Sequence, residues 1–179
     1  MKISLGEMAA RLITMDRDVG AAMEAAVVKG CKMIERKAKA QIGHLQPFWP
    51  PLAQSTQDER VRLGYAANKP LLRTGELKRS IQMAAPYRDG NRVFGYVFSD
   101  SEIAVYQELG TKTIPPRSFI KTAADGQAHL VAQMAAKMVV HAMVHGGKEY
   151  HLWKHVMHSF HRAGEKLKEA IPDDGDGEE

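Results

Sequence analysis

The chain has 179 residues, enough for one domain with a sizeable hydrophobic core. With 44% apolar residues, only 7% aromatic residues and ten methionines, it is expected to be a soluble protein whose helices pack through Ala, Met, Leu and Val. The formal net charge of +4 is unevenly divided: the last seven residues hold five of the 21 acidic side chains, so residues 1–172 carry an excess of nine positive charges.

This composition excludes an internal disulfide and argues against secretion or membrane insertion. Cys31 is the single cysteine and is expected to be a small buried hydrophobic residue. The first eight residues lack the apolar segment of a signal peptide, and the longest apolar stretch, Leu130 to Val144, is interrupted and too short to span a bilayer. We therefore expect assembly in a cytoplasm without a membrane partner. The basic excess indicates a solvated surface or contact with nucleic acid or an acidic protein.

A long helix is expected first, over residues 4–42. Apolar or small residues recur there every three or four positions, as in an amphipathic or coiled-coil helix. They are Met8, Leu12, Met15, Val19, Met23, Ala26, Gly30 and Met33. A continuous helix would be a rod of about 57 Å at 1.5 Å per residue, although Asp16 could instead cap a second helix after a short first one. The apolar stripe needs a partner, either the domain's own sheet or another subunit.

A proline-rich connector is expected over residues 43–55. Each residue that precedes a proline is pushed out of the helical region, so this segment should be extended and rigid. Phe48 and Trp49 within it are expected to anchor either onto the domain's own surface or at an interface. A helix is then expected to begin with Ser55 or Thr56 as its N-cap.

A short helix and a hairpin are expected next. Thr74 is placed to be the N-cap of a helix from Gly75 to about Ile81, which Leu72 and Leu77 would close onto the core. Apolar residues alternate on both sides of an Asp89-Gly90 turn, which predicts a β-hairpin over residues 82–98.

The remaining pattern is helical. A short helix should run from the Ser99-Asp100-Ser101 cap to Gly110, and a longer one over residues 116–145 should begin at its proline pair. A histidine-rich helix over 148–171 and an acidic tail over 172–179 are expected to follow a domain that spans 1–145. The predicted fold class is α+β, in which a long N-terminal helix and C-terminal helices flank a small antiparallel β-sheet.

Several blocks of this sequence, taken in order, carry a resemblance. The blocks are Trp49 and Pro51-Leu52 with Ser55-Thr56, Pro70-Leu71 with Thr74-Gly75-Glu76-Leu77 and Ser80-Ile81, Tyr106 with Glu108-Leu109-Gly110-Thr111, and Pro115-Pro116-Arg117 with Phe119. Together they resemble the virion morphogenesis proteins of tailed bacteriophages, which are neck, tail-completion or head-tail joining proteins. The likeness covers residues 1–145. It departs at Ser118, where the family usually has a second proline, and after Gly146.

The resemblance implies a non-enzymatic structural protein of the virion, part of the head-tail connection at the capsid connector. It also implies a homo-oligomeric ring, on the order of six or twelve subunits, beside connector or adaptor proteins and tail-terminator or tail-tube proteins. A tail-terminator ring is the alternative. A ring around exiting DNA could also touch it non-specifically. From the residues themselves, the hairpin, the connector and the long helix are rigid edges suited to head-to-tail contacts.

The candidate site residues are therefore structural or interfacial. Arg117 is expected to be an anchor paired with a carboxylate such as Glu108 or with a carbonyl, and Phe119 to fill the core beside it. The full set is Trp49, Pro51, Leu52, Thr74, Gly75, Leu77, Asp89, Gly90, Tyr106, Glu108, Gly110, Thr111, Pro116, Arg117 and Phe119. No catalytic residue, cofactor or metal is expected.

Two alternatives belong to other functional classes. His151, His155 and His158 recur at helical spacing on the side opposite Trp153 and Phe160, a pattern that can hold zinc. The sequence has no His-Glu-x-x-His motif and no cysteine pair, so a polar face or an interface is the preferred interpretation. A histidine-rich, metal-dependent nuclease is the enzyme alternative, and a basic DNA-binding protein is the other.

Overall fold

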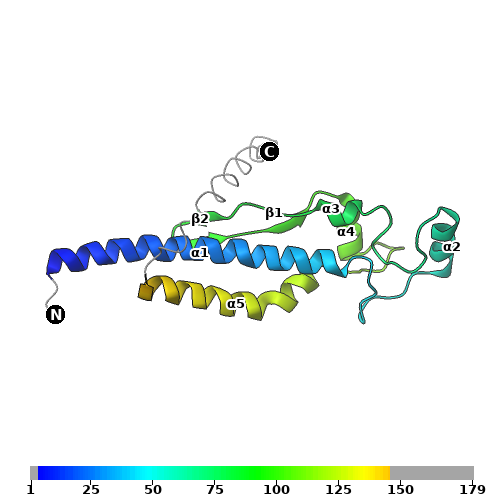
Figure 1. Cartoon of the computed structure of the whole chain (residues 1–179). Coiled ribbons are helices and arrows are strands. Elements are labelled where there is room, and N and C mark those ends of the chain that lie inside the picture. The colour runs from blue at the N-terminus through cyan, green and yellow to red at the C-terminus, as the bar shows by residue number, and fades with distance from the viewer. Residues whose placement is uncertain (1–3, 146–179) are drawn as a thin grey trace, which may run out of the picture.

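A single long helix, α1 (Leu5–Gln41), forms the spine of the molecule (Figure 1). The computed structural model describes residues 4–145. Ser4 and Glu7 form a capping box at the start of α1: the Glu7 amide donates to Ser4 Oγ at 3.2 Å and the Ser4 amide donates to Glu7 Oε2 at 2.8 Å. The helix runs through Asp16 without a break, so the expected continuous helix is present and a second cap at Asp16 is not.

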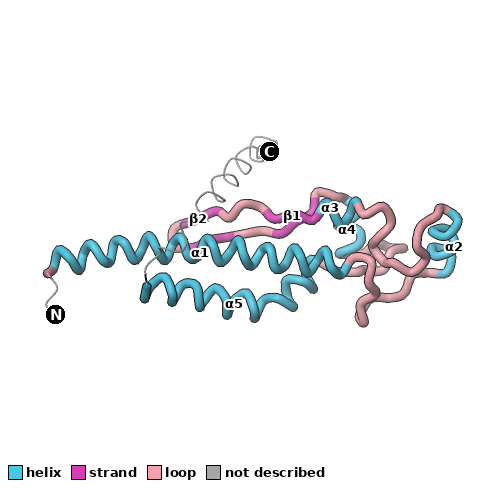
Figure 2. Tube along the Cα trace, viewed as in Figure 1, coloured by secondary structure: helices cyan, strands magenta, loops and turns pink. Residues whose placement is uncertain are grey.

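A long antiparallel hairpin lies along one side of α1 (Figures 1 and 2). Near its base, β1 (Ile81–Met83) pairs with β4 (Val97–Ser99); toward its tip, β2 (Tyr87–Asp89) pairs with β3 (Arg92–Phe94). Between the two ladders the Ala84 amide still donates to the Tyr96 carbonyl at 2.9 Å, and Pro86, which has no amide hydrogen, falls in this interruption. The predicted hairpin is confirmed.

The hairpin tip has a two-residue loop, Gly90-Asn91, between the paired residues Asp89 and Arg92. Gly90 has a φ of +55°, the left-handed value that the first position of such a tight loop favours. The predicted turn is therefore present, shifted by one residue so that Asp89 closes the ladder.

The last described helix, α5 (Ile120–His145), packs antiparallel to α1 on a side away from the hairpin (Figure 1). Glycines allow both neighbours of α1 to approach closely. A Cβ added to Gly30 of α1 would lie 2.7 Å from Val131 Cγ1 of α5, and one added to Gly95 would lie 2.5 Å from Val27 Cγ1 of α1. The hairpin, α1 and α5 thus form three successive layers with α1 in the middle.

The main hydrophobic core lies at the C-terminal end of α1, beside two of the three short helices, α3 (Glu76–Ser80) and α4 (Glu102–Leu109), whereas α2 (Gln54–Arg62) lies farther out beyond the connector (Figure 1). Its buried residues come from nearly every part of the described chain: Ala38, Ile42, Trp49, Leu77, Ile81, Ala104, Phe119 and Ala123. Phe119 is completely buried, as expected.

Several predicted helix starts differ from the structure. The helix expected over residues 116–145 begins only at Ile120, because a carboxylate from another helix caps it there. The helix α2 begins at Gln54, before the expected caps, and has no side-chain cap. Gly75 rather than Thr74 is the N-cap of α3, although Thr74 Oγ1 accepts a long hydrogen bond of 3.4 Å from the Glu76 amide. The predicted helix over 148–171 and the tail over 172–179 lie outside the described residues.

Candidate assembly surface

Predicted site residues meet in a region that we call the joint, made of residues 49–52, 107–111 and 117–122 beside the end of α1. Arg117 lies at its centre and is only 6% exposed. Its Nε and Nη2 donate to the Pro50 carbonyl at 3.3 and 3.0 Å, and Nη2 also donates to the Pro51 carbonyl at 3.2 Å. Of the two partners expected for Arg117, the carbonyl is present. An extended proline pair suits this role, because its carbonyls are not used by a helix.

Burial lowers the pKa of Arg117, and the positive charge of Arg60 adds to the effect. A guanidinium nevertheless stays protonated at neutral pH, so a charge is held inside the joint with its donors directed at backbone oxygens. Its own amide donates to the Gln107 carbonyl at 2.7 Å, which joins the end of α4 to the same residue.

Glu108, the other expected partner of Arg117, instead caps α5. Its Oε2 accepts from the amides of Phe119 and Ile120 at 2.8 and 3.0 Å, and its Oε1 accepts from the Lys121 amide at 2.9 Å. Oε1 also accepts from Ser118 Oγ at 2.6 Å. The first amides of a helix lack hydrogen-bond partners within the helix, and the positive end of the helix dipole lies there. The Glu108 carboxylate therefore accepts hydrogen bonds from three of these amides and also places a negative charge at the positive end of the dipole.

A tight loop between α4 and α5 directs Glu108 at these amides. The Thr111 amide donates to the Ile114 carbonyl at 2.8 Å, and Thr111 Oγ1 accepts from the Ile114 amide at 3.0 Å. Gly110 has a φ of +78°, and a Cβ there would lie 3.0 Å from both the Ile114 carbonyl oxygen and Pro116. The expected backbone-directing roles of Gly110, Thr111 and Pro116 thus have a geometric basis.

Two residues that the sequence did not single out complete the joint. Thr122 Oγ1 lies 3.0 Å from Gln41 Oε1, at the end of α1, and 2.8 Å from the Ser118 carbonyl. Trp49 Nε1 donates to the same carbonyl at 3.2 Å. Gln41 is only 5% exposed, and a buried polar side chain needs a hydrogen-bond partner. Nothing in the sequence identifies Thr122 as that partner.

The remaining predicted residues divide between the joint's surroundings and other places. Leu52 and Leu77 are buried near it, whereas Thr74 is exposed beside α3. Asp89 and Gly90 lie at the hairpin tip, far along α1 from the joint. A Cβ added there to Gly20 of α1 would lie 2.6 Å from Nη1 of the neighbouring Arg88. The joint is therefore a structural centre, and the expected hairpin edge is a separate feature.

Two exposed apolar surfaces lie toward opposite ends of α1. The first is the α1 overhang, residues 5–17, whose side chains are all exposed and which projects beyond α5 and the hairpin (Figures 1 and 2). Its large apolar residues are Leu5, Met8, Leu12, Ile13 and Met15. The second is the α4 face, which consists of Ile103, Val105, Tyr106 and Leu109, the last of them 74% exposed. Several exposed large apolar side chains on one helix segment are typical of interaction sites.

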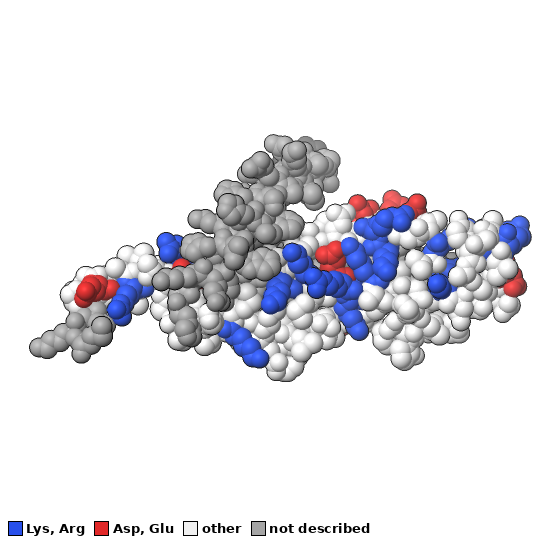
Figure 3. All heavy atoms as spheres, in the orientation of Figure 1, with Lys and Arg blue, Asp and Glu red and all other residues white. Residues whose placement is uncertain are grey.

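Basic side chains gather over the middle of the face seen in Figure 3. In α1, the exposed residues Lys29, Arg36 and Lys37 share one side of the helix at spacings of seven and eight. Lys78 and Arg79 of α3 are exposed as well, and α3 packs Leu77 into the same core as the end of α1. The basic excess expected from composition thus includes a local patch.

The described residues offer little reactive chemistry. Burial raises the pKa of the Cys31 thiol, and the negative charge of Glu35 adds to this, so the thiol is held neutral. Within residues 4–145, no group of three or more His, Cys, Asp or Glu side chains is placed to hold a metal ion. In the same range, no helix has the length and apolar character needed to cross a membrane. His151, His155 and His158, the candidate zinc ligands, lie outside the described residues.

A family comparison agrees with these features. Residues 6–110, more than half of the chain, match the family model described as "Bacteriophage HK97-gp10, putative tail-component". The match contains α1, the connector, the hairpin and α4 with Glu108, and it ends before Arg117 and Phe119. No curated protein and no solved structure matches the chain. The chain therefore belongs to the HK97 gp10-like family of bacteriophage tail components, which are tailed-phage morphogenesis proteins.

Proposed function

We propose that this phage tail component is a non-enzymatic neck protein, which joins or completes the tail at the capsid connector as a homo-oligomeric ring. The observation that carries the proposal is the pair of exposed apolar surfaces, the α1 overhang and the α4 face, at separate places on the described structure. An amphipathic helix segment with five exposed large apolar side chains is poorly stable in water alone and favours a partner that covers it.

The positions of the two surfaces favour a head-to-tail contact. α1 has 37 residues and is therefore about 55 Å long, with the overhang at one end and the joint, which positions α4, at the other. Different patches at opposite ends of a subunit make heterologous contacts, which close into a ring when the rotation between subunits permits. On the order of six or twelve copies would suit a tail or a connector.

The joint supports a structural rather than an enzymatic role. Its charged groups, Glu108 and Arg117, are directed at backbone amides and carbonyls and hold α4, α5 and the connector together. We therefore expect the neighbours to be connector or adaptor proteins on one side and tail-terminator or tail-tube proteins on the other. The protein would be assembled in the host cytoplasm, and in the finished virion it would lie in the neck.

Electron microscopy of particles from a phage that lacks this gene tests the role. Filled heads beside free tails of normal length would support joining or completion. Overlong tails would favour the tail-terminator alternative, and normal infectious particles would refute a structural role.

Complementation of that deletion tests the surface. Leu12→Asp on the α1 overhang should fail to restore joined particles, because a charge would replace an apolar contact. Ala10→Asp, at an exposed position on the other side of the same helix segment, is the matched control and should restore them. Full rescue by both variants would show that the overhang is not an interface.

A further inference from the structure

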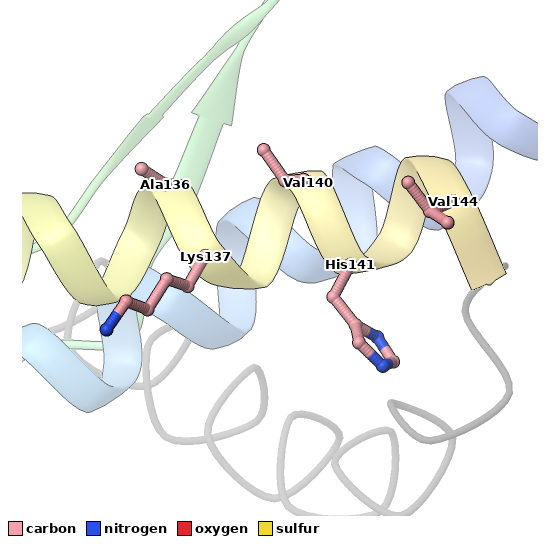
Figure 4. A pocket seen from close by; sticks show the side chains of 5 residues that line it. All are labelled: Ala136, Lys137, Val140, His141 and Val144. Carbon is pink, nitrogen blue, oxygen red and sulfur yellow. The ribbon is translucent and has the colours of Figure 1, made fainter.

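The outer side of α5 carries an apolar groove over its last three turns. Ala136, Val140 and Val144 line it along one row and Lys137 and His141 along the next, with an open volume of about 390 Å³ (Figure 4). This side is distinct from the one that packs on α1, where Ala142 is buried. Val140 is 57% exposed and Val144 is 68% exposed, so more than half of the surface of each residue is left uncovered.

We propose that this groove binds the chain's own residues 148–171. Apolar or small residues recur in that sequence every three or four positions, which predicts an amphipathic helix with one continuous apolar side. They are Trp153, Met157, Phe160, Gly164, Leu167 and Ile171. Two apolar stripes, one exposed on α5 and one predicted beyond it, would bury each other as an antiparallel helical pair.

The connection between the two stripes suits a reversal. α5 ends at His145, one residue after Val144 of the groove, and Gly146-Gly147 then precedes the segment. Glycine ends helices and permits tight turns between them. A helix of 24 residues would be about 36 Å long, and α5 itself, with 26 residues, is about 39 Å. A returning segment is thus long enough to cover the groove fully.

Attachment to the same chain favours this segment over a second copy. A segment tethered by two residues has an effective concentration in the millimolar range, whereas another molecule must associate at its solution concentration.

Hydrogen exchange of the full chain tests the proposal with a matched pair of variants. Ala136→Asp places a charge in the groove. Ala128→Asp makes the same change at an exposed alanine two turns earlier, at a different angle around α5. In the wild type, amides of residues 148–171 should exchange at least about tenfold more slowly than in an unstructured peptide. Ala136→Asp should abolish that protection, and Ala128→Asp should leave it unchanged.

The same measurement contains its own controls. Amides of residues 20–41 in α1 report whether each variant remains folded, and the wild-type protection tests the proposal even if Ala136→Asp does not fold. Unprotected amides at 148–171 in the wild type would overturn it, as would equal effects of the two variants. Protection that disappears when the protein is diluted about twentyfold would also overturn it, because the occupant would then be a second copy.

Discussion

At the residue scale, the joint depends on two charged side chains that both bind backbone. Glu108 satisfies three amides at the start of α5, and Arg117 satisfies two proline carbonyls of the connector. Glu108 is partly buried and Arg117 is buried. Each side chain links two segments that are not paired as strands of a sheet. Removal of either side chain would leave several backbone groups without partners, which costs more than a single exposed hydrogen bond.

Replacing the capping carboxylate tests its role. Glu108→Gln keeps the size of the side chain but removes its charge and one acceptor oxygen, so we expect the free energy of unfolding to fall by about 1–3 kcal/mol. Urea denaturation followed by circular dichroism measures it. Glu59→Gln is the control, because its ion pair with Arg73 is exposed and 3.6 Å long and should contribute less than about 0.5 kcal/mol. Equal losses of stability in the two variants would contradict the capping role.

Arg117→Ala should be more damaging, because it leaves the carbonyls of Pro50 and Pro51 partly buried without a donor. We expect the free energy of unfolding to fall by about 2–4 kcal/mol. Arg62→Ala, at an exposed position of α2, should change it by less than about 0.5 kcal/mol. Thermal and urea unfolding of both variants give the comparison. Unchanged stability and unchanged assembly of Arg117→Ala would remove the anchor hypothesis.

At the scale of elements, α1 is held between two layers by close approach as much as by large side chains. Gly30 admits Val131 of α5, and Gly95 of the hairpin admits Val27 and Cys31 of α1. Few bulky residues are needed at such positions, which agrees with the low aromatic content of the chain. The layers are therefore sensitive to added volume.

Two helix glycines should respond oppositely to the same substitution. Gly126→Ala in α5 has open space around the new Cβ, so the gain in helix propensity should stabilise the protein by about 0.5–1 kcal/mol. Gly30→Ala would place its Cβ 2.7 Å from Val131 Cγ1, on a stiff β-branched side chain, and the overpacking should destabilise the protein by a net amount of about 1 kcal/mol. The midpoints of urea unfolding of the two variants test this prediction. Stabilisation by both changes would mean that α1 and α5 adjust to the added methyl group at little cost.

Much of the element level was predictable from local pattern. The three-to-four spacing in α1 and the alternation around the hairpin are short-range signals, and both elements are present. The start of α5 was not predictable, because Glu108 lies 12 residues from Ile120 and proline pairs usually open a helix. Nor could the apolar stripe of α1 reveal that its first third is exposed while the rest is buried or partly buried. Met8 is exposed and Met23 is partly buried, although the two side chains have the same chemistry.

At the scale of the whole molecule, the described body is elongated along α1, with the apolar α1 overhang at one end and basic side chains gathered over the middle of one face (Figures 1 and 3). In a ring, such a middle could face the DNA that passes through. Contacts with phosphates are electrostatic and independent of sequence, so they are recognised by their dependence on salt.

A DNA contact predicts a measurable salt slope. The wild-type protein should bind a short duplex more weakly as salt rises, and replacing Lys29, Arg36 and Lys37 together by Ala should reduce the slope by about 0.9 for each phosphate that these side chains neutralise. A triple replacement of Arg11, Arg17 and Arg62, which are exposed elsewhere, should change it less. Fluorescence anisotropy at several salt concentrations measures the slope, and the same slope in both triple variants would argue against a local DNA-binding face.

The hydrogen bonds of the joint also determine the order in which parts of the chain can fold during synthesis. Its hydrogen bonds connect residues 67, 69 and 81 positions apart, from Pro50 to Arg117, Trp49 to Ser118 and Gln41 to Thr122. The long helix leaves the ribosome first, yet its C-terminal end can be locked only after residue 122 has emerged. For most of translation the protein is therefore a helix with an unshielded apolar stripe, and a chain that stops before Phe119 has no means of closing its core.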